Sequence, residues 1–236
     1  IKRICDRITV LRDGKKVADL NINDASIDNI IHLMVGRDIV NKYPKIKSNR
    51  GKEALSVQGL ERKGILHNIS FKAYTGEILG ITGLVGAGRT EMARAIIGAD
   101  PIDAGVVKIF GEEMNIRSPR DSIKAAIAFL PEDRRNQGLV LIKDVLFNVS
   151  LVKLKQYSHR GFLQLKNIHQ DVDQLVSELK IRTPSVNTIV AELSGGNQQK
   201  VVIAKWLLTK ARIFIFDEPT RGIDVGAKVE VYNLIN

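Results

Sequence analysis

The chain has 236 residues, of which 44% are hydrophobic and 26% are charged, and its formal net charge is +10. This length is sufficient for one large α/β domain with an appendage and a sizeable hydrophobic core. No apolar run approaches the roughly 20 residues needed to cross a bilayer, so we expect no membrane span within these residues. The single cysteine, Cys5, cannot form a disulfide within the chain and is compatible with a reducing compartment.

A net positive charge is compatible with binding to nucleic acid or to an anionic membrane surface. Here the excess is divided evenly between the first 50 residues and the rest, and only 5% of residues are aromatic. The aromatic residues do not alternate with the basic ones, so a platform for stacking bases is poorly supported. We therefore expect no nucleic-acid partner.

Residues 7–20, RITVLRDGKKVADL, predict a β-hairpin. Two apolar runs flank the dipeptide Asp13-Gly14, which favours a tight turn because glycine tolerates positive φ.

A capped helix is expected next, at residues 23–36, with Asp24 or Ser26 as the N-cap and Gly36 as the stop signal. Residues 37–53 are polar, basic and interrupted by proline, which is the composition of a linker. We therefore place a boundary there.

From residue 54 onward, short β-rich runs alternate with helical segments. This alternation predicts a mostly parallel sheet covered by helices. The expected strands are residues 54–60, 67–73, 77–83, 125–131 and 212–219, and the expected helices are residues 89–98, 166–180 and 201–208. The run at 77–83 is expected to be buried and to lead into a glycine-rich loop.

The loop Gly83–Thr90 reads GLVGAGRT. Two glycines separated by four residues, followed by a basic residue and threonine, let backbone N–H groups surround a phosphate beside a helix N-terminus. Gly86 and Gly88 permit a close backbone approach, and Thr90 is placed to offer its hydroxyl to Mg²⁺. A simple glycine-rich turn between a strand and a helix remains an alternative at this point.

Arg89 stands where such a loop normally carries lysine. Lysine is a compact, flexible point charge, whereas arginine is planar, bulkier and donates hydrogen bonds in a fixed fork. The positive charge is kept, but the small ammonium group at the β- and γ-phosphate oxygens is lost. We expect binding to survive this change more readily than hydrolysis, which depends on aligning charge with the transition state.

Two adjacent acids end the apolar run 213–216, in the sequence IFIFDEPT. The ends of such strands are where open α/β sheets present ligand-binding residues. Asp217 would bind Mg²⁺, and Glu218 would orient and activate a water against the γ-phosphate. Further upstream, LSGGNQQK at 193–200 places Ser194 at the start of a helix, which forms a second potential anion site.

Together these motifs closely resemble the ATP-binding subunits of ABC transporters, over residues 54–236. GLVGAGRT resembles the Walker A loop, LSGGNQQK the signature, IFIFDEPT the Walker B strand, and GIDVG the D-loop. The resemblance implies a P-loop NTPase of ABC type, an α/β protein with a mixed β-sheet core flanked by helices and a helical subdomain. It also implies a head-to-tail dimer in which each ATP lies between one Walker A loop and the partner's signature.

The resemblance assigns a role to each motif residue. Glu218 is implied as the catalytic residue. The implied phosphate-loop residues are Gly83, Val85, Gly86, Ala87, Gly88, Arg89, Thr90 and Glu91, and the implied contacts to the partner's ATP are Ser194, Gly195, Gly196, Asn197 and the D-loop Asp224. The implied Mg²⁺ ligands are Thr90, Glu132 and Asp217.

Finer similarity is to the subfamily that imports ribose, galactose and related monosaccharides, whose ATPase subunit has two fused nucleotide-binding domains. On this basis residues 1–36 are expected to be the C-terminal tail of a first domain, 37–53 the linker, and 54–236 a second domain truncated at its C-terminus. The helical subdomain is expected at about 134–208.

The sequence departs from this family at two further places. Residues 59–66 lack the aromatic ring that stacks on adenine, and Glu132 stands where the family usually has glutamine. The histidine that contacts the γ-phosphate is expected beyond Asn236.

The resemblance implies an ATP-binding and ATP-hydrolysing fragment, with ATP and Mg²⁺ as cofactors, that powers sugar import at the cytoplasmic face of the membrane. Its implied partners are a first nucleotide-binding domain or a second copy, permease subunits, and indirectly a sugar-binding protein. A catalytically weak regulatory half that lends its signature to a partner site is an alternative. A soluble ABC ATPase acting on nucleic acid or the ribosome is a further one.

Overall fold

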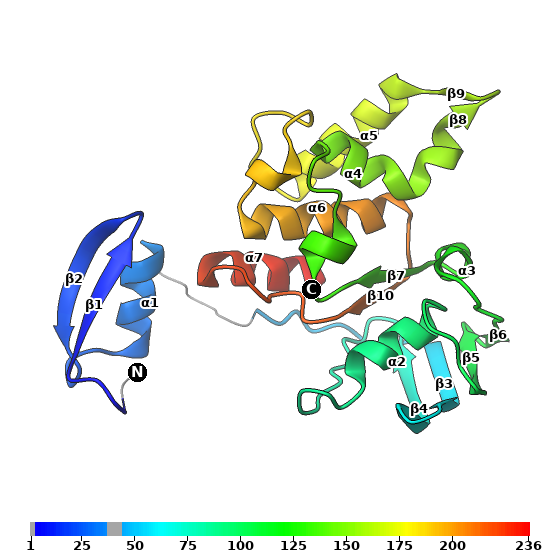
Figure 1. Ribbon diagram of the computed structural model, residues 1–236, viewed down its shortest axis with the longest axis horizontal. Coiled ribbons are helices and arrows are strands. Elements are labelled where there is room, and N and C mark those ends of the chain that lie inside the picture. Colours follow the sequence, from blue (N-terminus) through cyan, green and yellow to red (C-terminus); the bar gives the residue numbers. More distant parts are fainter. Residues whose placement is uncertain (1–2, 37–43) are drawn as a thin grey trace. The chain divides into compact units, whose positions relative to one another are not determined.

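The computed structural model describes residues 3–36 and 44–236 (Figure 1). The chain divides into two compact units: residues 1–46 with 222–236, and residues 47–221. Of the linker expected at 37–53, residues 37–43 lie outside the described residues, and the first strand of the larger unit begins at Glu53. Within the described residues, no helix is both long and apolar enough to span a membrane.

The smaller unit contains the expected hairpin and helix. Strands β1 (Arg7–Arg12) and β2 (Lys15–Asn21) pair antiparallel. The turn at Asp13 and Gly14 has φ angles of 51° and 74°, the left-handed pair that a tight hairpin turn requires. The unit also contains helices α1 (Ile27–Val35) and α7 (Val225–Ile235).

Helix α1 begins and ends as its sequence predicts. The Ser26 side chain, and not that of Asp24, is the N-cap and accepts a hydrogen bond of 3.0 Å from the Asn29 amide. Gly36 ends the helix at a φ of 77°.

The larger unit contains two sheets of different kinds. One has the antiparallel order β4-β3-β5-β6, and the other is the parallel pair β10-β7. The strands are β3 (Glu53–Arg62), β4 (Leu66–Tyr74), β5 (Ala104–Ile109), β6 (Glu112–Glu113), β7 (Ile127–Leu130) and β10 (Ile213–Phe216). The expectation of a mostly parallel sheet is therefore wrong. The three-residue link between β3 and β4 is too short for a parallel crossover, so these strands form a hairpin.

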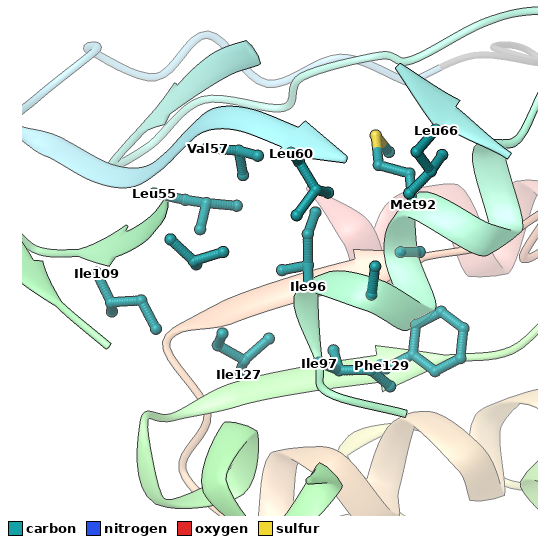
Figure 2. Close-up of a cluster of buried hydrophobic side chains, with 13 residues drawn as sticks. Leu55, Val57, Leu60, Leu66, Met92, Ile96, Ile97, Ile109, Ile127 and Phe129 are labelled. Carbon is teal, nitrogen blue, oxygen red and sulfur yellow. The ribbon is translucent and has the colours of Figure 1, made fainter. Parts of the chain in front are cut away.

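Helix α2 (Arg89–Ile96) joins the two sheets through the hydrophobic core (Figure 2). Ile96 lies between the β3 residues Val57 and Leu60 and the β7 residue Ile127, and all four side chains are almost fully buried. This packing fixes the start of α2 relative to the ends of β7 and β10. A short helix, α3 (Pro119–Lys124), precedes β7.

The helical part of this unit consists mainly of α4 (Val145–Ser150), α5 (Leu165–Glu178) and α6 (Gly195–Leu208). A π-helical turn at Arg134–Gly138 precedes them, and 3-10 helices span Leu151–Tyr157 and Val190–Glu192. All of these elements fall within residues 134–208.

The segment 77–83 corrects the sequence-based expectation of a buried strand. It forms no strand, and Ile78, Leu79 and Ile81 are 54%, 41% and 46% exposed. A strand needs a neighbour to accept and donate its backbone hydrogen bonds, and within the part of the chain that the structure describes β10 pairs only with β7. Apolar residues alone therefore do not make this segment a strand.

Helix α6 has buried polar side chains as well as apolar ones. The Lys205 ammonium donates to the carbonyl oxygen of Gly138, at the end of the π-helical turn. Burial lowers the pKa of this ammonium from 10.5 to about 8. The lysine thus ties α6 to the segment that follows β7.

Truncation of Ile96 to alanine should reduce the free energy of unfolding by about 2–5 kcal/mol, because the lost side chain leaves a cavity between the two sheets. Urea unfolding of the parent and the variant measures this difference. Ile102→Ala is the matched control, since Ile102 is 38% exposed and its loss should cost well under half as much. Equal losses for the two variants would contradict the central position of Ile96.

The lowered pKa of Lys205 predicts a pH-dependent stability. Between pH 8 and 10.5 the unfolded chain binds this proton more tightly than the folded protein, so stability should rise with pH. Compared with Lys205→Met, the parent should gain roughly 3 kcal/mol across this window. Urea unfolding of both proteins at several pH values checks this, and a constant difference would show that Lys205 has an ordinary pKa.

Candidate functional site

The glycine-rich loop leads directly into α2. Gly86 and Gly88 have φ angles of 82° and 85°, and Gly88 is the N-cap of α2. A Cβ atom at Gly88 would lie 3.2 Å from a methyl carbon of Leu66 and 3.4 Å from the carbonyl oxygen of Ile65. Conformation and space therefore both favour glycine at Gly88, and conformation alone favours it at Gly86.

The tip of this loop faces solvent. Leu84 and Val85 are 85% and 98% exposed, and a backbone hydrogen bond of 3.1 Å from Ala87 to Leu84 closes the turn. A Cβ atom at Gly83 would lie 3.0 Å from that of Ala87, which is tighter than most such contacts. Glu91 lies in the first turn of α2. The loop is thus an accessible, glycine-dependent turn at a helix N-terminus, as a phosphate site requires.

One hydrogen bond connects this loop region to the Asp-Glu pair. The hydroxyl group of Thr90 donates to Asp217 Oδ2 at 2.7 Å. Asp217 follows β10, and its amide donates to the carbonyl oxygen of Leu130 at the end of β7. The parallel pairing of these strands therefore places the carboxylate beside the start of α2.

An ion pair forms a second connection. Arg89 Nη2 lies 3.3 Å from Glu218 Oε1, and the two side chains are 31% and 43% exposed. Glu218 has a φ of 43°, which is in the left-handed region that side chains other than glycine rarely adopt. The residue expected to activate water is thus held by the residue expected to bind phosphate.

Glu132 also has an arginine partner. Its carboxylate forms an ion pair with Arg221, whose carbonyl oxygen accepts a 2.7 Å hydrogen bond from the buried guanidinium of Arg134. Sequence analysis did not single out Arg221 or Arg134. The sequence signal for Arg221 was its position between two motifs, directly after Asp-Glu-Pro-Thr and directly before GIDVG.

The signature residues Ser194–Asn197 form the capped N-terminus of α6. The Ser194 hydroxyl accepts hydrogen bonds from the amide and side-chain nitrogen atoms of Asn197, at 3.5 and 3.0 Å. Asn197 in turn accepts from the Arg182 amide at 2.9 Å, while Gly195 and Gly196 form the first turn of α6. In the part of the chain described by the structure, no hydrogen bond or ion pair connects these residues to the phosphate loop.

Asp224 belongs to the smaller unit, where it is the N-cap of α7 and accepts a hydrogen bond of 2.8 Å from the Ala227 amide. A nucleotide contact by Asp224 remains a prediction.

The oxygen atoms near Thr90 fit a hard divalent cation. Thr90 and Asp217 present a hydroxyl and a carboxylate oxygen 2.7 Å apart, and both are donor types that Mg²⁺ prefers. Among residues 3–36 and 44–236, no cluster of three or more acidic, histidine or cysteine side chains could hold a metal by itself.

The sequence of the larger unit matches a known protein family. The ABC transporter family matches residues 66–221, which include the phosphate loop, the signature and the Asp-Glu pair. The chain belongs to the ABC transporter family. Within it, the similarity is to ATP-binding proteins of ribose and related sugar importers, as the subfamily resemblance predicted.

Two relatives represent this group of ABC proteins. The ribose import ATP-binding protein RbsA of Bacillus licheniformis is 46% identical over 99% of this chain and 47% of its own length. RbsA 3 of Rubrobacter xylanophilus is 49% identical over 100% of this chain and 47% of its own length. The chain thus spans about half the length of these relatives.

Solved structures of ABC proteins confirm the fold. An ATP-binding cassette dimer in a post-hydrolysis state, bound to ADP and Pi, superimposes with a TM-score of 0.63 at 22% identity. The match covers 77% of this chain and 81% of that one. A second ATP-binding cassette, in its ADP conformation, gives a TM-score of 0.62 at 20% identity, over 77% of this chain and 74% of that one.

Replacing Thr90 by valine should reduce the free energy of unfolding by about 1 kcal/mol, because Asp217 loses a partly buried hydrogen bond. Urea unfolding measures the change. Thr75→Val is the control, since the Thr75 side chain is exposed, and it should change stability by no more than about 0.5 kcal/mol. An unchanged stability in Thr90→Val would show that the hydrogen bond contributes nothing in solution.

Proposed function

We propose that this chain binds and hydrolyses ATP, and that it powers the import of a monosaccharide through a membrane permease. The observation that carries the proposal is the convergence of two distant motifs at the start of α2. Thr90 and Asp217 share a hydrogen bond, and Arg89 and Glu218 share an ion pair. Phosphate-binding and water-activating groups are therefore within reach of one nucleotide.

The phosphate loop would bind the nucleotide's phosphates through its backbone N–H groups and the partial positive charge at the start of α2. Thr90, Asp217 and Glu132 would hold Mg²⁺, which when bound neutralises charge on the phosphate oxygens. Glu218 would orient a water molecule against the γ-phosphate and accept its proton. Before that, Glu218 must separate from Arg89, and Glu132 from Arg221, to reach these positions.

Arg89 gives the site its particular character. A guanidinium group can hold a phosphate and a carboxylate at once through its fork of donors, which a single ammonium does less readily. The ion pair with Glu218 therefore competes with the role of Glu218 as a base. We infer that the site binds ATP and hydrolyses it slowly compared with a lysine-containing loop.

The proposed substrate and partners rest on the names of the relatives. One is named as a ribose import protein, and another as a putative ribose, galactose or methyl galactoside import protein. A sugar-binding protein and permease subunits would complete such a system. We propose that the chain works at the cytoplasmic face of the membrane, paired head to tail with a first nucleotide-binding domain or a second copy. The signature residues Ser194–Asn197 would then contact the partner's ATP.

A second function is favoured by the same ion pair. If the ion pair between Arg89 and Glu218 persists when ATP is bound, Glu218 cannot act as a base. The chain would then be a regulatory half that binds nucleotide and contributes its signature residues to an active site on its partner. The two functions differ in turnover and not in binding.

Titration calorimetry with Mg-ATP, together with a phosphate-release assay, should distinguish them. We expect the parent and Arg89→Lys to bind with dissociation constants within about tenfold of each other, a difference below about 1.4 kcal/mol. Hydrolysis should increase in Arg89→Lys if Glu218 is freed. It should fall by about 100-fold or more in Glu218→Gln, which keeps the shape but removes the base.

Glu178→Gln is the control for the second substitution, because this glutamate is at the end of α5 and takes no part in the site. Binding by Arg89→Lys without binding by the parent would mean that the parent's site is vestigial. Binding by both the parent and Arg89→Lys, with no hydrolysis by either, would support the regulatory half. No binding by any of them would overturn both functions.

A further inference from the structure

A small β-hairpin extends from the helical part of the larger unit (Figure 1). Its strands are β8 (Ser158–His159) and β9 (Phe162–Leu163), and they pair antiparallel. Arg160 and Gly161 form the two-residue turn, with left-handed φ angles of 51° and 86°. The nucleotide site described above uses none of these residues.

The base of this hairpin is firmly attached. The Tyr157 side chain is 6% exposed, and its hydroxyl group donates to Asp171 of α5 at 2.5 Å. The amide of Gln164 donates to the carbonyl oxygen of Tyr157 at 2.9 Å, which closes the hairpin. Two strands of this length are not stable alone, so the attachment to α5 is what holds the tip in place.

The tip exposes large apolar side chains. Phe162 is 80% exposed, Leu163 is 46% exposed, and Leu165, just beyond the hairpin, is 59% exposed. Phe162 lies opposite His159 in the pairing register, so the ring has a polar neighbour across the strands. Exposed apolar groups on a firmly attached projection are typical of surfaces that contact another body.

The sequence that forms the tip is rich in basic residues, and the nearest acidic residues, Asp144 and Asp171, lie just outside it. Residues 145–170 contain four lysine or arginine residues and no aspartate or glutamate. Lys153 pairs with Asp171, at 3.8 Å. The remaining three cations, Lys155, Arg160 and Lys166, are exposed, and none has an ion-pair partner in the described part of the chain.

We propose that the β8–β9 hairpin binds the surface of an anionic phospholipid bilayer. The projecting tip can insert the exposed side chains of Phe162 and Leu163 between lipid headgroups. Unpaired lysine and arginine side chains around inserted aromatic and leucine residues are the combination that binds anionic interfaces. The proposal does not depend on ATP hydrolysis, because the hairpin and the nucleotide site share no residue.

Co-sedimentation of the whole chain with protein-free vesicles tests the proposal. One set of vesicles contains phosphatidylcholine alone, and the other contains equal parts of phosphatidylcholine and phosphatidylglycerol. We expect binding to the anionic set only. Phe162→Ser should weaken it by about tenfold or more, the loss expected for a buried aromatic side chain. Arg160→Ala and Lys166→Ala should each weaken it by about fivefold.

Two control variants separate the hairpin from the general basicity of the chain. Leu11→Ser removes a 65% exposed side chain from the other hairpin, β1–β2, and Lys63→Ala removes an exposed cation from the β3–β4 turn. Both should bind like the parent, and circular dichroism should show that all variants remain folded.

Three results would overturn the proposal. The first is equal binding to neutral and anionic vesicles. The second is a loss of binding in Lys63→Ala as large as in Arg160→Ala, which would show that net charge alone is responsible. The third is that the parent binds neither set of protein-free vesicles, which would show that the hairpin has no affinity for lipid alone.

Discussion

The hydrogen bond between Thr90 and Asp217 joins residues that are 127 positions apart, and the candidate site depends on it. Each residue is placed by a different element, one by the start of α2 and the other by the end of β10. The elements are held together by the core around Ile96, which packs between the antiparallel sheet and β7. Burial of apolar side chains thus determines the distance between two polar groups.

The polar groups of the site satisfy one another within the chain. Thr90 donates to Asp217, Arg89 pairs with Glu218, and Arg221 pairs with Glu132. Each pairing keeps a charged or polar side chain from being left without a partner in a partly buried position. A nucleotide with its cation would replace these contacts by others of the same kind. Binding therefore exchanges partners, and its net free energy is smaller than the new contacts alone suggest.

In the helical part of the larger unit, cationic side chains are likewise paired within the chain, here with backbone carbonyl groups. The ammonium of Lys205 donates to the carbonyl oxygen of Gly138, and that of Lys200 donates to the carbonyl oxygen of Lys180 at 2.9 Å. Arg134 donates to the carbonyl oxygen of Arg221. Long cationic side chains of α6 and the π-helical turn therefore bind backbone carbonyl groups of neighbouring segments.

Much of this architecture could be predicted from the sequence. The hairpin turn at Asp13-Gly14, the Ser26 cap and the phosphate loop have local causes, namely positive φ, side-chain capping and backbone approach. The segment 77–83 could not be predicted correctly, because an apolar run does not reveal whether a neighbouring strand is present to pair with it. Nor could the ion pair between Arg89 and Glu218, since a contact between distant residues depends on the packing of the whole unit.

The backbone at Glu218 has a consequence for the handedness of the site. At a φ of 43°, this residue adopts the conformation that a mirror-image amino acid would prefer. A D-glutamate introduced by chemical ligation would relax the turn but direct its carboxylate away from where the L-residue directs it. The left-handed backbone at Glu218 therefore sets the direction of its side chain. This conformation carries a backbone strain on the order of 1 kcal/mol.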